Sequence, residues 1–156
     1  MTSTLHTSLD TNRILALAEA APTAAPEFAP ALIVGDLVYT SGQLPMKDGA
    51  LAGEGILGET VTVAQGASLA RLCTANAIAA IADVVDLSRV ECVVKLTGFV
   101  ASGPDFHDQP AVMNGASSLL EEVFGEAGRH TRSAIGVASL PRNAPVEVEL
   151  IVKLLG

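Results

Sequence analysis

The distribution of hydrophobic and polar positions indicates paired strands at the start of the domain. In the stretch "ALIVGDLVYTSG", which begins at Ala31, two apolar runs flank Gly35 and Asp36, an arrangement typical of a β-hairpin. The next stretch, "QLPMKDGALAGEGILGE", is loop-like, with a second turn at Asp48 and Gly49 and a short strand expected at residues 50–52. The chain is therefore expected to enter its sheet through a hairpin.

Two later segments have the periodicity of helices. Thr62 can open a helix that runs to about Asp83, and Pro110 can occupy the first turn of a second helix that ends at Phe124, before Gly125. In the first segment, apolar or small side chains recur at steps of three and four residues: Val63, Ala67, Ala70, Thr74, Ala77, Ile78 and Ile81. Such a one-sided stripe predicts a helix that packs on a sheet.

Three more segments read as strands. "VECVVKLTGFVAS" is rich in β-branched residues, and residues 131–139 and 146–154 form two further strands joined by "LPRNAP". In the last strand the even positions are apolar, whereas the other face carries Glu147 and Glu149 together with Ile151 and Lys153. The order of elements predicts an α+β fold, a mixed sheet covered on one face by two helices.

The first 27 residues are expected to form an arm outside a single domain at residues 28–156. Asp10 or Thr11 can cap a short helix that runs to about Ala20, and the proline-rich stretch "APTAAPEFAP" then makes an extended connector. The 156 residues suit one domain with its own hydrophobic core.

Charge and composition exclude several classes of function. The net charge is −8, with nine Lys and Arg and no basic run, so RNA and DNA are unfavoured partners. The first residues lack the pattern of a signal peptide, and no apolar run reaches the roughly 20 residues that span a bilayer. Cys73 and Cys92 are too few for a disulfide framework and are interpreted as buried thiols. We expect a soluble, cytoplasmic protein without a membrane partner.

Arg132, in the stretch "HTRSAIGVASLP", is the first candidate for chemistry. Its simpler interpretation is an ion pair with an acid or contact with solvent. The sharper one uses its small neighbours Ser133, Ala134 and Gly136, which leave space beside the guanidinium for a carboxylate bound through two hydrogen bonds.

The glutamates and the loop at residues 40–45 are further candidates. Glu149 is expected at a solvated edge, whereas a glutamate near an arginine can orient or deprotonate a water, and alternation does not decide which glutamate does so. "TSGQLP", with Gly42, is either a plain turn or a stretch of backbone that lines a pocket.

Other motifs are missing from the sequence. His6, His107 and His130 lack the spacing of metal ligands and are interpreted as structural. No GxSxG, P-loop or GxGxxG motif occurs, so a nucleotide cofactor is not expected.

Four motifs in order give the chain a resemblance to a known family. "VYTSGQLP" (residues 38–45), "VVKLTGFV" (93–100), the helix segment around Asn114 and "TRSAIGVASLPRNAPVEVELI" (131–151) resemble the RidA (YjgF) family. The resemblance spans residues 28–154 and is closer to a YjgF-like branch, labelled "endoribonuclease L-PSP", with an N-terminal extension and a longer second helix. It implies a chorismate-mutase-like fold and a homotrimer with a central barrel and clefts between subunits.

The resemblance also implies a function. RidA proteins hydrolyse enamine and imine intermediates such as 2-aminoacrylate to 2-keto acids and ammonia. By motif, Arg132 would clamp the carboxylate of a small metabolite, Glu147 would position the attacking water, Gly42 would line the cleft and Asn114 would lie near it. No metal or organic cofactor is implied.

Two departures from the family pattern bear on the substrate. Ala134 stands where many RidA proteins have a cysteine, and Phe28 where many have a tyrosine. A non-catalytic trimer that binds or senses a small acid is the alternative function. An endoribonuclease is disfavoured by the acidic composition.

Overall fold

The computed structural model describes Ala16 and residues 27–156, so the predicted N-terminal helix lies outside the described residues apart from Ala16. The strands are β1 (Ala31–Val34), β2 (Leu37–Thr40), β3 (Met46–Lys47), β4 (Ala50–Leu51), β5 (Val90–Ala101), β6 (Thr131–Val137) and β7 (Val146–Leu154). The long helices are α2 (Val63–Ala82) and α3 (Gln109–Phe124), and the short 3-10 turns are η1 (Leu87–Arg89), η2 (Gly125–Gly128) and η3 (Pro141–Asn143).

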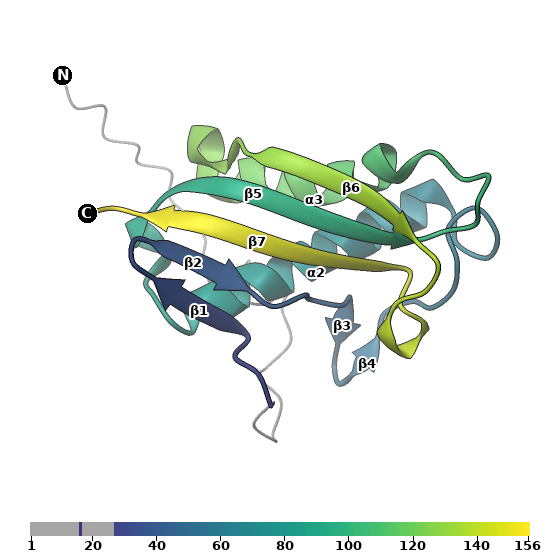
Figure 1. Ribbon diagram of the computed structural model, residues 1–156, viewed down its shortest axis with the longest axis horizontal. Coiled ribbons are helices and arrows are strands. Elements are labelled where there is room, and N and C mark those ends of the chain that lie inside the picture. The colour runs from purple at the N-terminus through teal and green to yellow at the C-terminus, as the bar shows by residue number, and fades with distance from the viewer. Residues whose placement is uncertain (1–15, 17–26) are drawn as a thin grey trace.

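A five-stranded mixed sheet carries the fold. Its order is β1-β2-β7-β5-β6, in which only β5 and β6 run parallel. Figure 1 shows α2 and α3 together on one side of this sheet, while the side toward the viewer is left open. The prediction of an α+β fold with two helices on one face is therefore confirmed, and the two faces are called the helix face and the open face below.

The short connection between β6 and β7 is not a hairpin. The chain crosses β5, so β6 pairs only with β5 and β7 lies on the other side of β5. β6 also ends at Val137, two residues earlier than predicted, because its partner β5 ends at the paired residue Ala101. Although β6 and β7 are neighbours in sequence, they are therefore not paired with each other.

The helix boundaries follow the predicted caps. The Thr62 hydroxyl accepts a hydrogen bond from the Gln65 backbone at the start of α2, and the Gln65 side chain reciprocates as a capping box. α3 has Pro110 in its first turn and ends at Gly125, whose φ of 59° lies in the left-handed region. Both predicted helices are confirmed.

The β1–β2 hairpin is also confirmed, with Gly35 in its turn at φ 64°. The second turn is correct, but it joins β4 to β3, a two-residue strand that the loop-like sequence did not predict. Cys73 is buried as expected, whereas Cys92 is only partly buried. Cys92 pairs with Lys153 beside an irregularity of β5, and this position faces away from the helices.

The hydrophobic core lies between the helix face and the two helices. Along β7 the residues alternate strictly between buried and half-buried positions, as the sequence predicted. The helices meet at close range, since a Cβ added to Gly115 of α3 would lie 2.0 Å from the Ala67 carbonyl oxygen of α2. Among the described residues, the helices are too short or too polar to cross a membrane.

Candidate functional site

Arg132 lies on the helix face of β6. It pairs with the buried Leu96 of β5, and residues paired side by side in a parallel ladder project to the same side. The Arg132 Nη1 group donates one hydrogen bond to Asn114 Oδ1 and one to Ser117 Oγ of α3, each at 3.0 Å. Arg132 is half-buried, and its hydrogen-bond partners are an amide and a hydroxyl, whereas the simpler interpretation expected an acid or solvent alone.

The other edge of the guanidinium is open. Within residues 27–156, the Nε and Nη2 groups of Arg132 have no hydrogen-bond or ion-pair partner. Nε–H and one Nη2–H point the same way in a planar guanidinium, so they form a fork that matches the two oxygens of a carboxylate. Ala134, the next residue of β6 on this face, is small and packs against the core.

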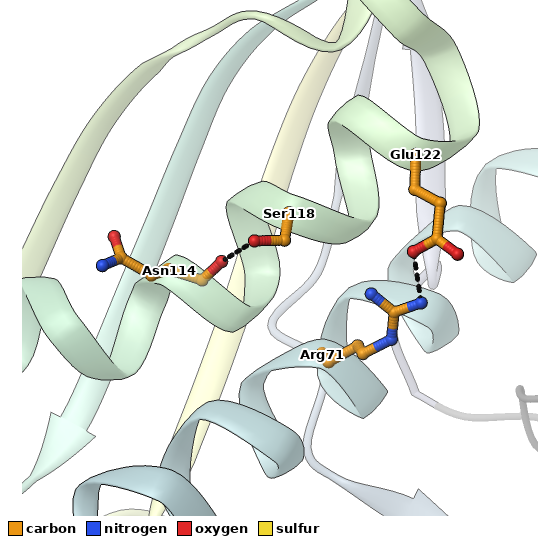
Figure 2. Close-up of polar contacts among 4 residues, drawn as sticks. All are labelled: Arg71, Asn114, Ser118 and Glu122. Atoms are coloured by element: carbon orange, nitrogen blue, oxygen red, sulfur yellow. Dashed lines mark hydrogen bonds and ion pairs between the residues drawn. The ribbon is translucent and has the colours of Figure 1, made fainter.

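Asn114 is directed toward Arg132 by its position on α3. Figure 2 shows its amide pointing away from α2, whereas Glu122, two turns later, reaches back to Arg71 of α2 in an ion pair of 2.5 Å. The Ser118 hydroxyl donates to the Asn114 carbonyl at 2.8 Å, which satisfies the backbone of this turn. One side of α3 thus holds the two helices together while another presents Asn114 to the sheet.

Ser117 and His130 extend the group around Arg132, and the sequence interpretation missed both. Ser117 Oγ lies 3.0 Å from His130 Nε2, and His130 Nδ1 lies 2.6 Å from the Gly128 carbonyl oxygen. His130 was interpreted as structural because it has no metal-ligand spacing. The available signal was its place two residues before Arg132, since alternate positions on an extended chain share a side.

Glu147 lies on the opposite side of the sheet. It pairs with Phe99 of β5, between Val146 and Val148, both of which are buried on the helix face. Gly42 is in direct contact with it, because a Cβ added to Gly42 would stand 1.7 Å from Glu147 Oε1. Gly42, which the family resemblance places in the lining of a cleft, thus leaves room for the Glu147 carboxylate because it has no side chain.

The environment of Glu147 favours its protonated form. Partial burial is the main cause that raises the pKa of Glu147, and the negative charge of Glu149 on the same face is the second. Glu149 itself is half-buried in the central strand β7, paired with Thr97, so the expected solvated edge was wrong. Alternation put both glutamates on one face, and the three atoms nearest to a Cβ at Gly42 all belong to Glu147.

The loop that carries Gly42 is held on both sides. Gln43 and Val148 exchange two backbone hydrogen bonds of 2.9 and 3.0 Å, which fixes the loop to β7. The buried Asn76 of α2 donates from Nδ2 to the carbonyls of Leu44 and Met46 at 3.0 and 3.1 Å. Gly42 is thus kept against Glu147 by hydrogen bonds in which neither takes part.

The predicted site residues, together with Ser117 and His130, form two groups within one chain. The anchor half-site comprises Arg132, Asn114, Ser117 and His130 on the helix face, and the glutamate half-site comprises Glu147 and Gly42 on the open face. A single chain does not bring these half-sites together. Arg132, the candidate group for binding a carboxylate, and Glu147, the candidate base, lie on opposite sides of the sheet.

The described residues also form a cavity outside the two half-sites. It has a volume of about 310 Å³ and lies between residues 57–59 and 103–106. In the part of the chain that the structure describes, no three His, Cys, Asp or Glu side chains gather as metal ligands.

Comparison with known proteins places the chain among relatives of mixed description. A family model described as "YjgF/chorismate_mutase-like, putative endoribonuclease" matches residues 11–154. Protein TCP17 of Trypanosoma cruzi is 44% identical over 86% of this chain and 86% of its own. A Dermatophagoides farinae protein named 2-iminobutanoate/2-iminopropanoate deaminase is 32% identical over 85% of this chain and 89% of its own.

Solved structures agree with the fold. The crystal structure of the Agrobacterium tumefaciens protein Atu1372, described as of unknown function, has a TM-score of 0.83 and 44% identity, covering 96% of this chain and 95% of its own. E. coli TdcF with bound serine has a TM-score of 0.61 and 25% identity, covering 86% of this chain and 94% of its own.

Proposed function

The chain belongs to the YjgF/chorismate mutase-like family, and from this membership we propose that it hydrolyses small enamine or imine carboxylates to 2-keto acids and ammonia. The observation that carries the proposal is the open Nε and Nη2 edge of Arg132, held by Asn114 and Ser117. The name of the Dermatophagoides farinae relative and the serine in TdcF support a substrate of the amino-acid type, with one carboxylate and a nitrogen on the adjacent carbon.

The proposed reaction needs one base and one water, and an enamine enters it as its imine tautomer, in which a proton has moved from the nitrogen to the terminal carbon. Arg132 binds the substrate carboxylate, and the Glu147 carboxylate takes a proton from water as the water oxygen bonds to the imine carbon. The C=N electron pair moves to nitrogen, which receives the proton from Glu147. Glu147 then transfers the new hydroxyl proton to nitrogen as the C–N bond breaks, so ammonia leaves, a carbonyl forms and Glu147 is again a carboxylate.

The site is proposed to be completed between copies in a homotrimer. Arg132 and Glu147 of one chain face opposite sides of its sheet, so the anchor half-site of one copy must meet the glutamate half-site of the next. The open face supports such contact, since it exposes Leu32, Val34, Tyr39 and Ile135. Three copies joined head to tail close a ring with three equivalent sites.

Ammonia release from 2-aminoacrylate, generated in the assay, tests this function. Arg132→Ala should lower kcat/KM about 10- to 100-fold, the loss expected for hydrogen bonds to a charged group. Arg71→Ala is the matched control, because it removes an arginine that pairs with Glu122 outside both half-sites. Equal rates for Arg132→Ala and the wild type would refute the proposal.

Two further measurements, thermal melting with a ligand and cleavage of RNA, separate the alternative functions. A small-acid sensor would show ligand-dependent melting without ammonia release by the wild type. An endoribonuclease would cleave RNA in an Arg132-dependent manner, although the net charge of −8 offers little attraction for phosphates.

A further inference from the structure

The hydroxyl of Ser117 behaves differently from others in the two long helices. Ser68, Thr74 and Ser118 each donate to the backbone carbonyl four residues earlier, the usual bond of a helical hydroxyl. Ser117 makes no such bond. Its oxygen lies between the Arg132 guanidinium and the His130 imidazole instead.

We propose that His130, acting through Ser117, is a positioning residue that sets which edge of the Arg132 guanidinium faces the ligand. The inference rests on the proposed function for the identity of that ligand. It concerns residues for which the family motifs assigned no role.

The direction of the hydrogen bonds follows from donor chemistry. The Gly128 carbonyl can only accept, so His130 Nδ1 carries a proton and donates to it. In the uncharged ring Nε2 is then an acceptor, and the Ser117 hydroxyl donates to it. The Ser117 oxygen keeps its lone pairs for the Arg132 Nη1 group. A continuous chain of hydrogen bonds therefore runs from Arg132 through Ser117 and His130 to the Gly128 carbonyl, and it is called the relay below.

The end of this chain is fixed to rigid backbone. Gly128 is buried, and a Cβ there would stand 2.1 Å from the Leu120 carbonyl oxygen, so η2 packs directly on α3. The imidazole is thereby held at one end, and Ser117 is prevented from turning back to its own helix.

The consequence falls on Arg132. The two acceptors of Nη1 fix both the position and the plane of the guanidinium. With Asn114 as the sole acceptor, the guanidinium could rotate about the one remaining hydrogen bond. A fixed plane presents Nε and Nη2 to a carboxylate without first being ordered, and such preorganisation improves binding. Loss of the relay should therefore weaken carboxylate binding more than it slows the chemical step.

Two substitutions of His130 separate positioning from a merely structural role. His130→Gln can place an acceptor near the Nε2 position but loses the donor to Gly128, whereas His130→Asn can keep the donor and loses the acceptor. We expect Ser117→Ala and His130→Asn to raise KM about 3- to 10-fold with kcat changed less than about 2-fold, and His130→Gln to restore most of the loss. The reverse order, with His130→Asn normal and His130→Gln impaired, would overturn the inference, as would a wild-type KM in His130→Asn.

A readout without turnover keeps this test separate from the proposed function. ¹⁵N NMR of the Arg132 side chain, assigned with Arg132→Lys, should show hindered rotation about Nε–Cζ in the wild type and His130→Gln, and faster rotation in Ser117→Ala and His130→Asn. Unchanged rotation in folded His130→Asn refutes the relay. If the relay is seen but the wild type neither binds pyruvate in calorimetry nor releases ammonia, the proposed function fails while the positioning role stands.

Discussion

At the scale of single residues, the candidate site depends on which face of the sheet each side chain occupies. Alternation along β7 correctly put Glu147 and Glu149 on one face, because the period of a strand is two. The same rule could not relate Arg132 to Glu147, since their relation depends on the pairing of β6 with β5 and not on either strand alone. The relay through His130 required the position of α3, which a strand pattern does not contain.

Gly42→Ala should disable the glutamate half-site. The new Cβ would overlap Glu147 Oε1 and force that carboxylate aside. We expect kcat for ammonia release to fall at least about 10-fold, since general-base catalysis depends on placement. Gly103→Ala is the matched control, because its Cβ would also approach a glutamate oxygen, that of the exposed Glu59, at 3.2 Å. Equal losses in both variants would contradict the role of Gly42.

The raised pKa of Glu147 should appear in the pH dependence of activity and stability. A base must be ionised, so kcat/KM should fall as pH decreases through the Glu147 pKa, which is raised from its ordinary value by burial first and by Glu149 second. Glu149→Gln should move this fall in kcat/KM to lower pH, because it removes one cause of the raised Glu147 pKa. The pKa should stay raised in part, because burial is the larger cause. A pH dependence of kcat/KM that is unchanged in Glu149→Gln would contradict the assignment of Glu147 as the base.

The sign for stability is opposite to that of an ion-paired carboxylate. The folded state binds the Glu147 proton more tightly than the unfolded state, so stability falls as pH rises from the ordinary glutamate pKa through the raised one. The change that Glu147→Gln causes in the free energy of unfolding should therefore be more stabilising at pH 7 than at pH 4. Urea unfolding at the two pH values measures this.

At the scale of elements, the boundaries with clear local chemistry were predicted well. The Thr62 capping box, the proline in the first turn of α3 and the Gly35 turn each act within a few residues, so the sequence contains their cause. The placement of β6 beside β5 was not predicted, because parallel pairing through a crossover helix is a long-range contact.

The contact of α2 with α3 at Gly115 gives a test at this scale. Gly115→Ala would place a methyl group 2.0 Å from the backbone oxygen of Ala67, which cannot rotate away. We expect the free energy of unfolding to fall by about 1–3 kcal/mol or more, despite the higher helix propensity of alanine. Chemical denaturation measures this, with the exposed Ser118→Ala on the same helix as control. A change below about 0.5 kcal/mol would contradict the close helix contact.

At the scale of the whole molecule, the sheet separates the two half-sites. The helices cover one face of the sheet and leave the other open (Figure 1). The helix face carries the candidate anchor Arg132, and the open face carries the candidate base Glu147 together with exposed apolar side chains. The family resemblance predicted both Arg132 and Glu147 and implied clefts between subunits. The strand pairing gives the physical reason, because it puts the two side chains on opposite faces of one sheet. The proposed function therefore requires a second copy.

Mixing two inactive variants tests this central claim most directly. Subunits with Arg132→Ala keep an intact glutamate half-site, and subunits with Glu147→Gln keep an intact anchor half-site. If sites form between neighbouring copies of a trimer, an equal mixture refolded together should recover about one quarter of the wild-type ammonia release, because about one interface in four receives both intact halves. No recovery, with mixed trimers confirmed by mass spectrometry, would contradict the shared site.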